Sequence, residues 1–380
     1  MKIVFVSNYF NHHQQPLSDA LYALTDGQYV FIATTPLSEE RRRLGYGKAP
    51  LPPYVQFSYP GLDAWRHCRQ LIEEADVVIA GSAPYELLRG RIRQGKLLFC
   101  YHERPLKKGF SVIKYLPRLI LWRHRMPQQK PIYLLCAGAY VARDYDLFGM
   151  YRGKCFRWGY FPEAKHYPDL EGMLGKKASH TLLWCGRMIH WKHPDHALQA
   201  VKRLRQEGYD LRLRFVGTGQ MEAQLKAMAA QWNLEDCVTF CGPMPPEQVR
   251  AEMEQSGIYL FTSDRQEGWG AVVNEAMNSG CAVVASHAPG VVPYLLRDGE
   301  NGLIYESGNV DALCQQIRML LDDPDCQRHL GRAAYETIAQ QWNGPVAAQR
   351  FIELAAALLR DEPPQLPPDG PCSQATVLEK

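Results

Sequence analysis

Residues Glu267–Ala285 read EGWGAVVNEAMNSGCAVVA. No helix-breaking residue interrupts the segment AVVNEAMN, so we expect a helix there. Gly280 suits the left-handed residue that often follows the end of a helix. The apolar run Cys281–Ala285 predicts a short buried strand. The stretch therefore predicts a loop, a helix and a strand, with one carboxylate before the helix, Glu267, and one inside it, Glu275.

Two glycines and two carboxylates around a helix start suit an anionic ligand that is rich in hydroxyl groups. Backbone N–H groups at a helix start attract anions, and Gly268 and Gly270 allow a ligand to approach the backbone closely. Carboxylates accept hydrogen bonds from hydroxyls. A sugar nucleotide combines these features. The alternative is an ordinary amphipathic helix with solvated glutamates, which is the better interpretation of an isolated E-G-x-G pattern.

A second motif lies upstream, where residues 186–192 read GRMIHWK. Together with two glutamates eight positions apart, this motif resembles the signature of retaining GT-B glycosyltransferases, in particular glycosyltransferase family four (group 1 type). The resemblance spans most of the chain. It implies an α/β fold of two Rossmann-like domains that face an interdomain cleft, with a C-terminal helix that crosses back to the first domain.

The resemblance also implies an activity. A retaining hexosyltransferase would move a hexosyl group from a nucleotide-diphosphate sugar, with a UDP-sugar as the favoured donor, to a hydroxyl of a glycan or lipid-linked acceptor. No metal ion, cofactor or nucleic acid is expected to take part. Two alternatives stay open: a catalytically silent sugar-nucleotide-binding subunit of a polysaccharide assembly complex, and a GT-B sugar-nucleotide epimerase.

The resemblance assigns the donor to the second half of the chain. Arg187 and Lys192 would neutralise the leaving diphosphate, since arginine offers a planar fork to phosphate oxygens and lysine a point charge. Both, with Glu267, are expected to be catalytic. The segment Cys241–Met244 resembles the loop that holds the base through backbone groups. The expected donor-binding residues are Gly186, Arg187, Lys192, Gly217, Gly242, Met244, Glu267, Gly268, Trp269, Gly270, Ala271, Val272 and Glu275.

Two further catalytic candidates lie in the first half of the chain. Lys96–Tyr101 predicts a strand, and His102 and Glu103 follow it directly. Related enzymes carry a histidine near the reacting sugar at this place. A histidine at a strand end can hydrogen-bond the sugar or the acceptor hydroxyl. The alternative is a loop histidine paired to Glu103, and the catalytic interpretation is modestly favoured.

The loop after the first predicted strand, Lys2–Asn8, lacks the glycine-rich pattern that family members often have. Side chains must therefore make the contacts that a glycine-rich loop would make, and His12, His13 and Gln14 are candidates to face the donor phosphates or the acceptor. A solvated polar loop is an equally good interpretation.

The composition is that of a globular protein, with 380 residues, 46% of them hydrophobic, 22% charged, and a net charge of +3. This length predicts two domains. The apolar run at the start of the chain is too short for the core of a signal peptide, and no apolar run is long enough to span a bilayer. The 11 cysteines form no CxxC pair, which predicts reduced thiols in a cytoplasmic protein.

Charge is distributed unevenly. Residues 1–170 carry +10 and the remainder −7, and Lys107–Lys130 holds seven Lys and Arg with no acid, interleaved with aromatic and aliphatic residues. Such a segment is a candidate contact with an anionic membrane surface, which would place the protein peripherally on the inner face of a membrane. A partly buried helix with a solvated basic face is the slightly favoured alternative.

The predicted domain boundaries follow from the motifs and linkers. We expect an acceptor-side Rossmann-like domain over residues 1–165 and a nucleotide-sugar-binding domain over 178–340, joined by a polar linker. Residues 341–360 predict the helix that returns to the first domain. The proline-rich tail, residues 361–380, predicts disorder.

Overall fold

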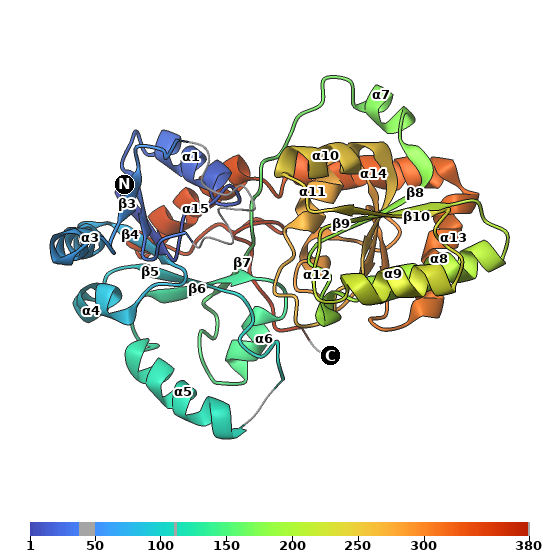
Figure 1. The fold of residues 1–380 in the computed structure, drawn as a ribbon. Helices are drawn as coiled ribbons and strands as arrows, with labels where there is room; N and C mark the ends of the chain where they lie inside the picture. The colour runs from blue at the N-terminus through green and yellow to red at the C-terminus, as the bar shows by residue number, and fades with distance from the viewer. Residues whose placement is uncertain (38–49, 110–111, 379–380) are drawn as a thin grey trace. The chain divides into compact units, whose positions relative to one another are not determined.

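The computed structural model describes residues 1–37, 50–109 and 112–378, and within helix 112–125 the side chains from residue 117 onward. The chain divides into two compact units (Figure 1). The first consists of Met1–Glu163 and Asn343–Lys380, and the second of Ala164–Trp342. The chain thus leaves the first unit once and returns to it with its last helix.

The first unit is built on a seven-stranded parallel sheet in the order β3-β2-β1-β4-β5-β6-β7. The order reverses at β1, which pairs with β2 on one side and β4 on the other. This is a doubly wound sheet, in which ligands bind outside the carboxyl ends of the strands. The strands are β1 Ile3–Ser7, β2 Tyr29–Ala33, β3 Val55–Phe57, β4 Val77–Ala80, β5 Leu98–His102, β6 Ile132–Ala137 and β7 Cys155–Trp158.

Helices cover this sheet, and one of them comes from the end of the chain. That helix, α15, packs against α1, as predicted for a helix returning to the first domain. The start of α15 approaches α1 closely, because a Cβ on Gly344 would lie 2.7 Å from the backbone carbon of Pro16. The helices of this unit are α1 Gln15–Leu24, α3 Leu62–Glu74, α4 Tyr85–Gln94, α5 Val112–Arg125, α6 Val141–Asp146 and α15 Gly344–Leu359.

The second unit has a six-stranded parallel sheet in the order β10-β9-β8-β11-β12-β13. Its strands are β8 Ala178–Cys185, β9 Arg212–Val216, β10 Val238–Gly242, β11 Ser256–Phe261, β12 Ala282–Ser286 and β13 Leu303–Tyr305. Its helices are α7 Leu170–Gly175, the 3-10 helix η1 His190–Lys192, α8 Pro194–Gln206, α9 Glu222–Gln231, α10 Pro246–Gln255, α11 Val272–Asn278, α12 Val292–Leu295, α13 Val310–Asp322 and α14 Pro324–Gln340.

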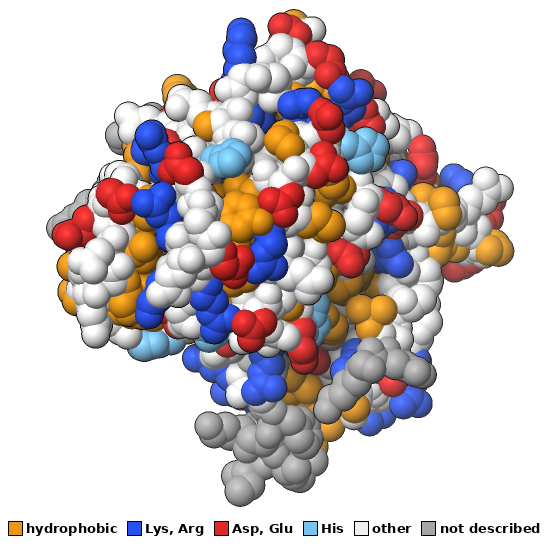
Figure 2. Space-filling model, turned by 90° about the vertical axis from the view of Figure 1, so that its right-hand side faces the viewer, with side chains coloured by type: hydrophobic (Ala, Val, Ile, Leu, Met, Phe, Trp, Pro, Cys, Tyr) orange, Lys and Arg blue, Asp and Glu red, His pale blue; other side chains and the backbone are white. Residues whose placement is uncertain are grey.

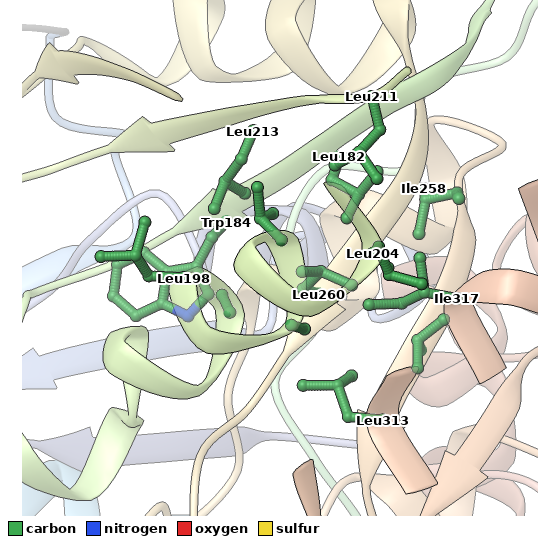
Figure 3. Packing of buried hydrophobic residues seen from close by; sticks show 14 of the residues in the cluster. Leu182, Trp184, Leu198, Leu204, Leu211, Leu213, Ile258, Leu260, Leu313 and Ile317 are labelled. Carbon is green, nitrogen blue, oxygen red and sulfur yellow. The ribbon is translucent and has the colours of Figure 1, made fainter. Parts of the chain in front are cut away.

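A large apolar core lies between this sheet and helices α8, α9 and α13 (Figure 3). Leu182 and Trp184 of β8 contribute to it from the strands, and Leu198 of α8 and Leu313 of α13 from the helices. Side chains two positions apart on a strand point to the same face of the sheet. The alternate residues therefore point to the opposite face, which α10, α11 and α14 cover. The core fixes β8 and β11 side by side, and with them the loops that follow.

The surface of the second unit carries both signs of charge. Figure 2 shows acidic and basic side chains interspersed on the face that it presents. Ion pairs between helices contribute to this pattern, such as Arg318 with Glu207 at 2.7 Å. Exposed pairs of this kind contribute about 0–1 kcal/mol each. They therefore add little to the stability of the fold.

The stretch from Glu267 to Ala285 folds as predicted. A loop leads into α11, and β12 follows. Gly280 takes φ +67° after the helix, and a Cβ there would lie 2.6 Å from a methyl carbon of Leu174. The left-handed turn and the close packing both require glycine.

The prediction of a disordered tail is wrong for residues 369–375, which pair with other parts of the first unit. The tail pairs with β7, which is the edge strand of the first sheet. Arg157 N–H donates to Ser373 O at 2.8 Å, and Cys372 N–H donates to Arg157 O at 2.9 Å. The guanidinium of Arg157 also pairs with Asp369 at 2.5 Å. Proline content suggested disorder, but the open backbone groups of an edge strand supply partners that composition does not reveal.

None of the helices in the described ranges is both long and apolar enough to cross a bilayer.

Candidate functional site

Glycine backbones meet where three strands of the second sheet end. Gly186 follows β8 and its N–H donates to Val216 O at 3.0 Å, while Gly217 N–H donates to Gly242 O at 2.8 Å. A Cβ on Gly217 would lie only 2.0 Å from Gly186 O, so no larger residue fits there without moving the loop. Three of the predicted donor-binding glycines are thereby brought together at the carboxyl edge of the sheet.

Lys192 and Glu267, 75 positions apart, form an ion pair beside these loops. Both side chains are largely buried. Ser263 Oγ donates to Glu267 at 3.4 Å. Thr262 fixes the other partner, since its hydroxyl donates to Lys192 O at 2.6 Å and accepts from Trp184 Nε1 at 2.9 Å. The motif at 186–192 and the EGWG loop thus meet in one polar cluster, as their joint assignment to a donor site requires.

Arg187 differs from Lys192 in its surroundings. Its side chain is exposed and makes no ion pair or hydrogen bond with another residue in the described ranges. A guanidinium carries five N–H donors in a planar fork that matches phosphate oxygens. The site therefore holds one cation that is already paired and one that is available to an anion.

The EGWG loop depends on close packing. Gly270 takes φ +96°, and a Cβ there would lie 2.5 Å from Phe261 Cζ. The Trp269 side chain is fully buried, and its indole N–H donates to Asn274 Oδ1 at 2.9 Å. A donor can therefore meet Trp269 only through its backbone. Helix α11 spans Val272–Asn278, which is the predicted segment AVVNEAMN without its first residue.

Glu275 lies on α11, and its environment is unusual for a carboxylate. Burial raises its pKa from the ordinary 4.5 to about 7, against the opposing effect of Arg250. The Arg250 guanidinium donates to Glu275 O at 3.2 Å and to Asn278 Oδ1 at 2.9 Å, so it holds the helix rather than the carboxylate. Gly268, Ala271 and Val272 complete the expected donor segment around the same helix start.

The second unit contains contributors to this site that the sequence did not single out. Arg250 secures the end of α11, Thr262 ties β11 to the motif loop, and Ser263 contacts the paired glutamate. The signal for the last two was weak but present, since polar residues directly follow a buried strand. Arg250 lies on a different helix, and no local pattern indicates its contacts. Met244 is half-buried in the loop after β10.

In the first unit, His102 lies at the end of β5 and Glu103 follows it. His102 Nδ1 is 2.6 Å from Tyr145 Oη, and burial lowers the histidine's pKa to about 4. The imidazole is therefore neutral at physiological pH. Glu103 accepts from Lys107 Nζ and Tyr160 Oη, both at 3.0 Å. His102 is thus held by Tyr145, and not by the alternative pairing with Glu103.

The loop after β1 is ordered by its own side chains. Asn11 Oδ1 accepts from His13 N–H at 2.9 Å, and Gln14 Oε1 accepts from Asn11 N–H at 3.1 Å. Gln14 is buried and immediately precedes α1. The rings of His12 and His13 lie 3.9 Å apart between centroids. Gln14 therefore shapes the loop, whereas the two imidazoles are the parts that can meet a ligand.

Comparison with known families matches residues 174–337 to the profile described as Glycosyl transferases group 1. Among curated relatives, an uncharacterized glycosyltransferase of Haemophilus influenzae is 28% identical over 45% of this chain and 50% of its own length. A D-inositol 3-phosphate glycosyltransferase of Corynebacterium aurimucosum is 30% identical over 48% of this chain and 44% of its own length. The chain thus matches about half the length of these relatives.

Solved structures resemble a larger part of the chain. Anabaena HepE, in complex with UDP and glucose, covers 94% of this chain with its whole length at a TM-score of 0.68 and 16% identity. The lipopolysaccharide outer core galactosyltransferase WaaB, in its apo form, covers 94% at a TM-score of 0.66 and 15% identity. At such identities the likeness shows the fold, and it extends through both units.

Proposed function

We propose that this chain, whose residues 174–337 match the profile of glycosyl transferases group 1, transfers a hexosyl group from a nucleotide-diphosphate sugar to an acceptor hydroxyl with retention of configuration. Its two doubly wound sheets and the return of α15 to the first unit are the GT-B architecture. The observation that carries the proposal is the meeting of Lys192 with Glu267 beside three strand-end glycines.

The second unit supplies the groups that a leaving diphosphate needs. Arg187 offers an available guanidinium, and Lys192 lies close by in sequence with a charge now balanced by Glu267. Preorganised cations aimed at a developing negative charge stabilise the transition state without reorganising. When the diphosphate binds Lys192, Glu267 is released toward the sugar, where its oxygens accept from hydroxyls. This exchange of partners is the central step that we assign to the pair.

Glu275 recognises the nucleoside in this proposal. As a carboxylate it accepts hydrogen bonds from ribose hydroxyls, and the loop at Gly242–Met244 contacts the base through its backbone. UDP is the favoured nucleotide, and support comes from the structural relative HepE, whose complexes contain UDP and UDP-glucose. The raised pKa of Glu275 links donor affinity to pH near neutrality.

The reaction itself proceeds by attack of the acceptor hydroxyl on the face that the diphosphate leaves. The bond from the anomeric carbon to the phosphate oxygen breaks, the bond to the acceptor oxygen forms, and the leaving phosphate takes the acceptor proton. His102, neutral because of its low pKa, hydrogen-bonds the sugar or the acceptor. Glu103 keeps its loop in shape through Lys107 and Tyr160. His12 and His13 are candidates for the acceptor.

The test is transfer from radiolabelled UDP-hexoses and GDP-hexoses to a panel of glycan and lipid-linked acceptors. The expected result is acceptor-dependent release of UDP with a labelled product of retained configuration. Donor binding without nucleotide release in the presence of any acceptor supports the alternative of a silent binding subunit. Conversion of the donor to its epimer without an acceptor supports an epimerase. Either result contradicts the transferase proposal.

A membrane contact through Lys107–Lys130 is the narrower part of the proposal. Several of its cations have partners within the protein, among them Lys107 with Glu103, Arg125 over the Tyr85 ring at 4.7 Å, and Lys130 with Ile92 O at 2.6 Å. Trp122 packs against Tyr145 and Phe148, so it is not an inserting residue. Phe110 lies outside the described residues.

The surface available for this contact is therefore smaller than the sequence suggested. Ile120 and Leu121 are exposed at 63% and 43%, and Arg123 is exposed beside them. We propose that this part of α5, together with Lys108, contacts an anionic bilayer. A lipid-linked acceptor would make such a contact useful, because the acceptor is assigned to this unit.

A further inference from the structure

Three metal-ligating side chains gather where α8 begins. The sequence there is His193-Pro-Asp195-His196, directly after the motif that ends at Lys192. One donor atom from each of the three side chains lies within 4.8 Å of the others. The two imidazole rings stack with centroids 4.4 Å apart, and His193 takes φ +46°, an uncommon conformation for a residue with a side chain. An unusual backbone thus holds these groups together.

Two atoms of this cluster are buried without a partner. Asp195 Oδ1 and His196 Nδ1 make no hydrogen bond with any other residue in the part of the chain that the structure describes. Leaving a buried polar atom unpaired costs about 1–3 kcal/mol, so such atoms are rare in folded proteins. Asp195 Oδ1 lies 4.0 Å from His193 Nδ1. A ligand between Asp195 and His193 would satisfy Asp195 Oδ1, and His196 Nε2 faces the same carboxylate, 3.9 Å from Asp195 Oδ2.

A fourth residue orients one of the imidazoles. Asp264 Oδ2 is 3.4 Å from His193 Nε2, and the Asp264 carboxylate is itself held by Gln266 N–H at 2.7 Å. When His193 donates from Nε2, its Nδ1 presents a lone pair toward Asp195. A carboxylate behind a histidine is the usual outer partner of a metal-ligating imidazole.

We propose that His193, Asp195 and His196 form a binding site for a divalent transition-metal ion, with Zn²⁺ as the best match. Two imidazole nitrogens and one carboxylate oxygen suit Zn²⁺ and its neighbours, whereas Mg²⁺ and Ca²⁺ prefer oxygen ligands. Zinc bonds of about 2.0–2.2 Å place tetrahedral ligands about 3.3 Å apart, so the side chains must close in by about an ångström. Their exposures of 14–28% leave a path for the ion.

The position of this site suggests a structural role. His193 belongs to the loop that carries Lys192, and Asp264 belongs to the loop that carries Glu267. An ion bound to His193 would strengthen the link between the two loops that the Lys192–Glu267 pair already joins. The ion would therefore stabilise the donor loops from outside the reacting centre. This inference stands apart from the proposed transfer reaction, since it requires only metal binding.

The test is a Zn²⁺ titration of the full chain after dialysis against a chelator, followed by calorimetry and by metal analysis of the repurified protein. The expected result is one ion per chain, a rise in unfolding temperature with Zn²⁺, and at least tenfold weaker binding in His196→Leu and Asp195→Asn. His193→Asn, which tolerates the positive φ, is a third variant should one of these not fold. The matched control is His329→Ala, which removes an exposed histidine on α14.

Cysteines are the competing ligands, because Cys185, Cys241 and Cys326 are partly exposed. Substitution with Co²⁺ separates the two cases, since thiolate ligands add a charge-transfer band that a His/Asp site lacks. Absence of stoichiometric binding overturns the proposal. Binding that is unchanged in folded Asp195→Asn and His193→Asn, or that carries the thiolate band, overturns it as well.

Discussion

The loops that follow the strands present their polar groups in opposite ways in the two units. In the second unit, the backbones of Gly186 and Gly217 pack against each other, and Arg187 makes no ion pair or hydrogen bond with the residues that the structure describes. In the first unit, His102 is bonded to Tyr145, and Glu103 has partners on both oxygens. The second unit is open to an anion, whereas the first presents preformed, neutral or balanced groups. Under the proposed function, this difference predicts that donor binding depends on charges that can change partners, and acceptor binding on groups that stay fixed.

The largest effect is expected from Lys192→Met. Loss of the cation removes stabilisation of the leaving diphosphate and leaves the buried carboxylate of Glu267 unpaired, so kcat should fall about 10²–10³-fold. Initial rates of UDP release measure this. The control is Lys226→Met, which removes the lysine of the more exposed Lys226–Glu222 pair. Equal rates in Lys192→Met and Lys226→Met would contradict the role of Lys192.

Glu275→Gln should move affinity and stability in opposite directions. Loss of charge-assisted hydrogen bonds should weaken UDP binding by about 1.5–3 kcal/mol. The free energy of unfolding of the ligand-free protein should rise by up to about 3 kcal/mol at pH 8, because a folded pKa raised to about 7 disfavours the native state once the unfolded chain ionises.

The stability advantage of Glu275→Gln over the wild type depends on pH in a defined way. Below pH 4.5 the carboxyl is protonated in both states and the variant has no advantage; between 4.5 and 7 the advantage grows, and above 7 it is complete. Denaturant unfolding at pH 4.5 and pH 8 measures it. A variant that is less stable than the wild type at pH 8 would show that burial of Glu275 carries no such cost.

The same group predicts how donor affinity depends on pH. UDP binding to the wild type should weaken as pH falls from 8 to 6, because Glu275 takes up a proton with a pKa of about 7. Phosphate ionisation of UDP contributes in this range too, so Glu275→Gln is the reference. Titrations at both pH values should give a larger change for the wild type than for the variant. Equal changes would assign the pH dependence to the ligand alone.

How far the sequence predicted this site differs between its parts. The order of loop, helix and strand around α11 was predictable, since Gly280 and the apolar run mark local structure. The meeting of Lys192 with Glu267 followed only from the family resemblance; physically it arises because β8 and β11 are neighbours in the sheet. The tail on β7 was missed because its partners are brought together by tertiary packing. The cluster at His193 lies within four consecutive residues, and only the positive φ of His193 and the distant Asp264 were beyond local sequence reasoning.

His102→Phe tests the role proposed for the first unit, whose polar groups keep their partners. The ring keeps its packing on Tyr145 but loses its hydrogen bonds, so transfer should fall about tenfold, the equivalent of one hydrogen bond, while UDP affinity stays unchanged. His67→Phe, an exposed change on α3, is the control. Because the pKa of His102 is about 4, it should contribute no titration to the wild-type rate between pH 5.5 and 8. A loss of UDP affinity in His102→Phe would place the histidine on the donor instead.

The smallest effect is expected at the membrane. Lys108→Glu with Arg123→Glu should reduce co-sedimentation with anionic vesicles several-fold at low salt, since each cation near such a surface contributes about 1 kcal/mol and salt screens it. Arg89→Glu, an exposed change on α4, is the control. Equal binding to neutral and anionic vesicles would leave α5 as a solvated helix.

Calorimetric titration of UDP into the wild type, Lys192→Met and Glu267→Gln tests the exchange of partners most directly. The diphosphate competes with Glu267 for Lys192, so removing the lysine should weaken UDP binding at least tenfold. Neutralising Glu267 frees the lysine and should leave UDP binding equal or tighter, although hexosyl transfer falls. Unchanged affinity in Lys192→Met, or a loss of UDP affinity in Glu267→Gln as large as that in Lys192→Met, would contradict this account.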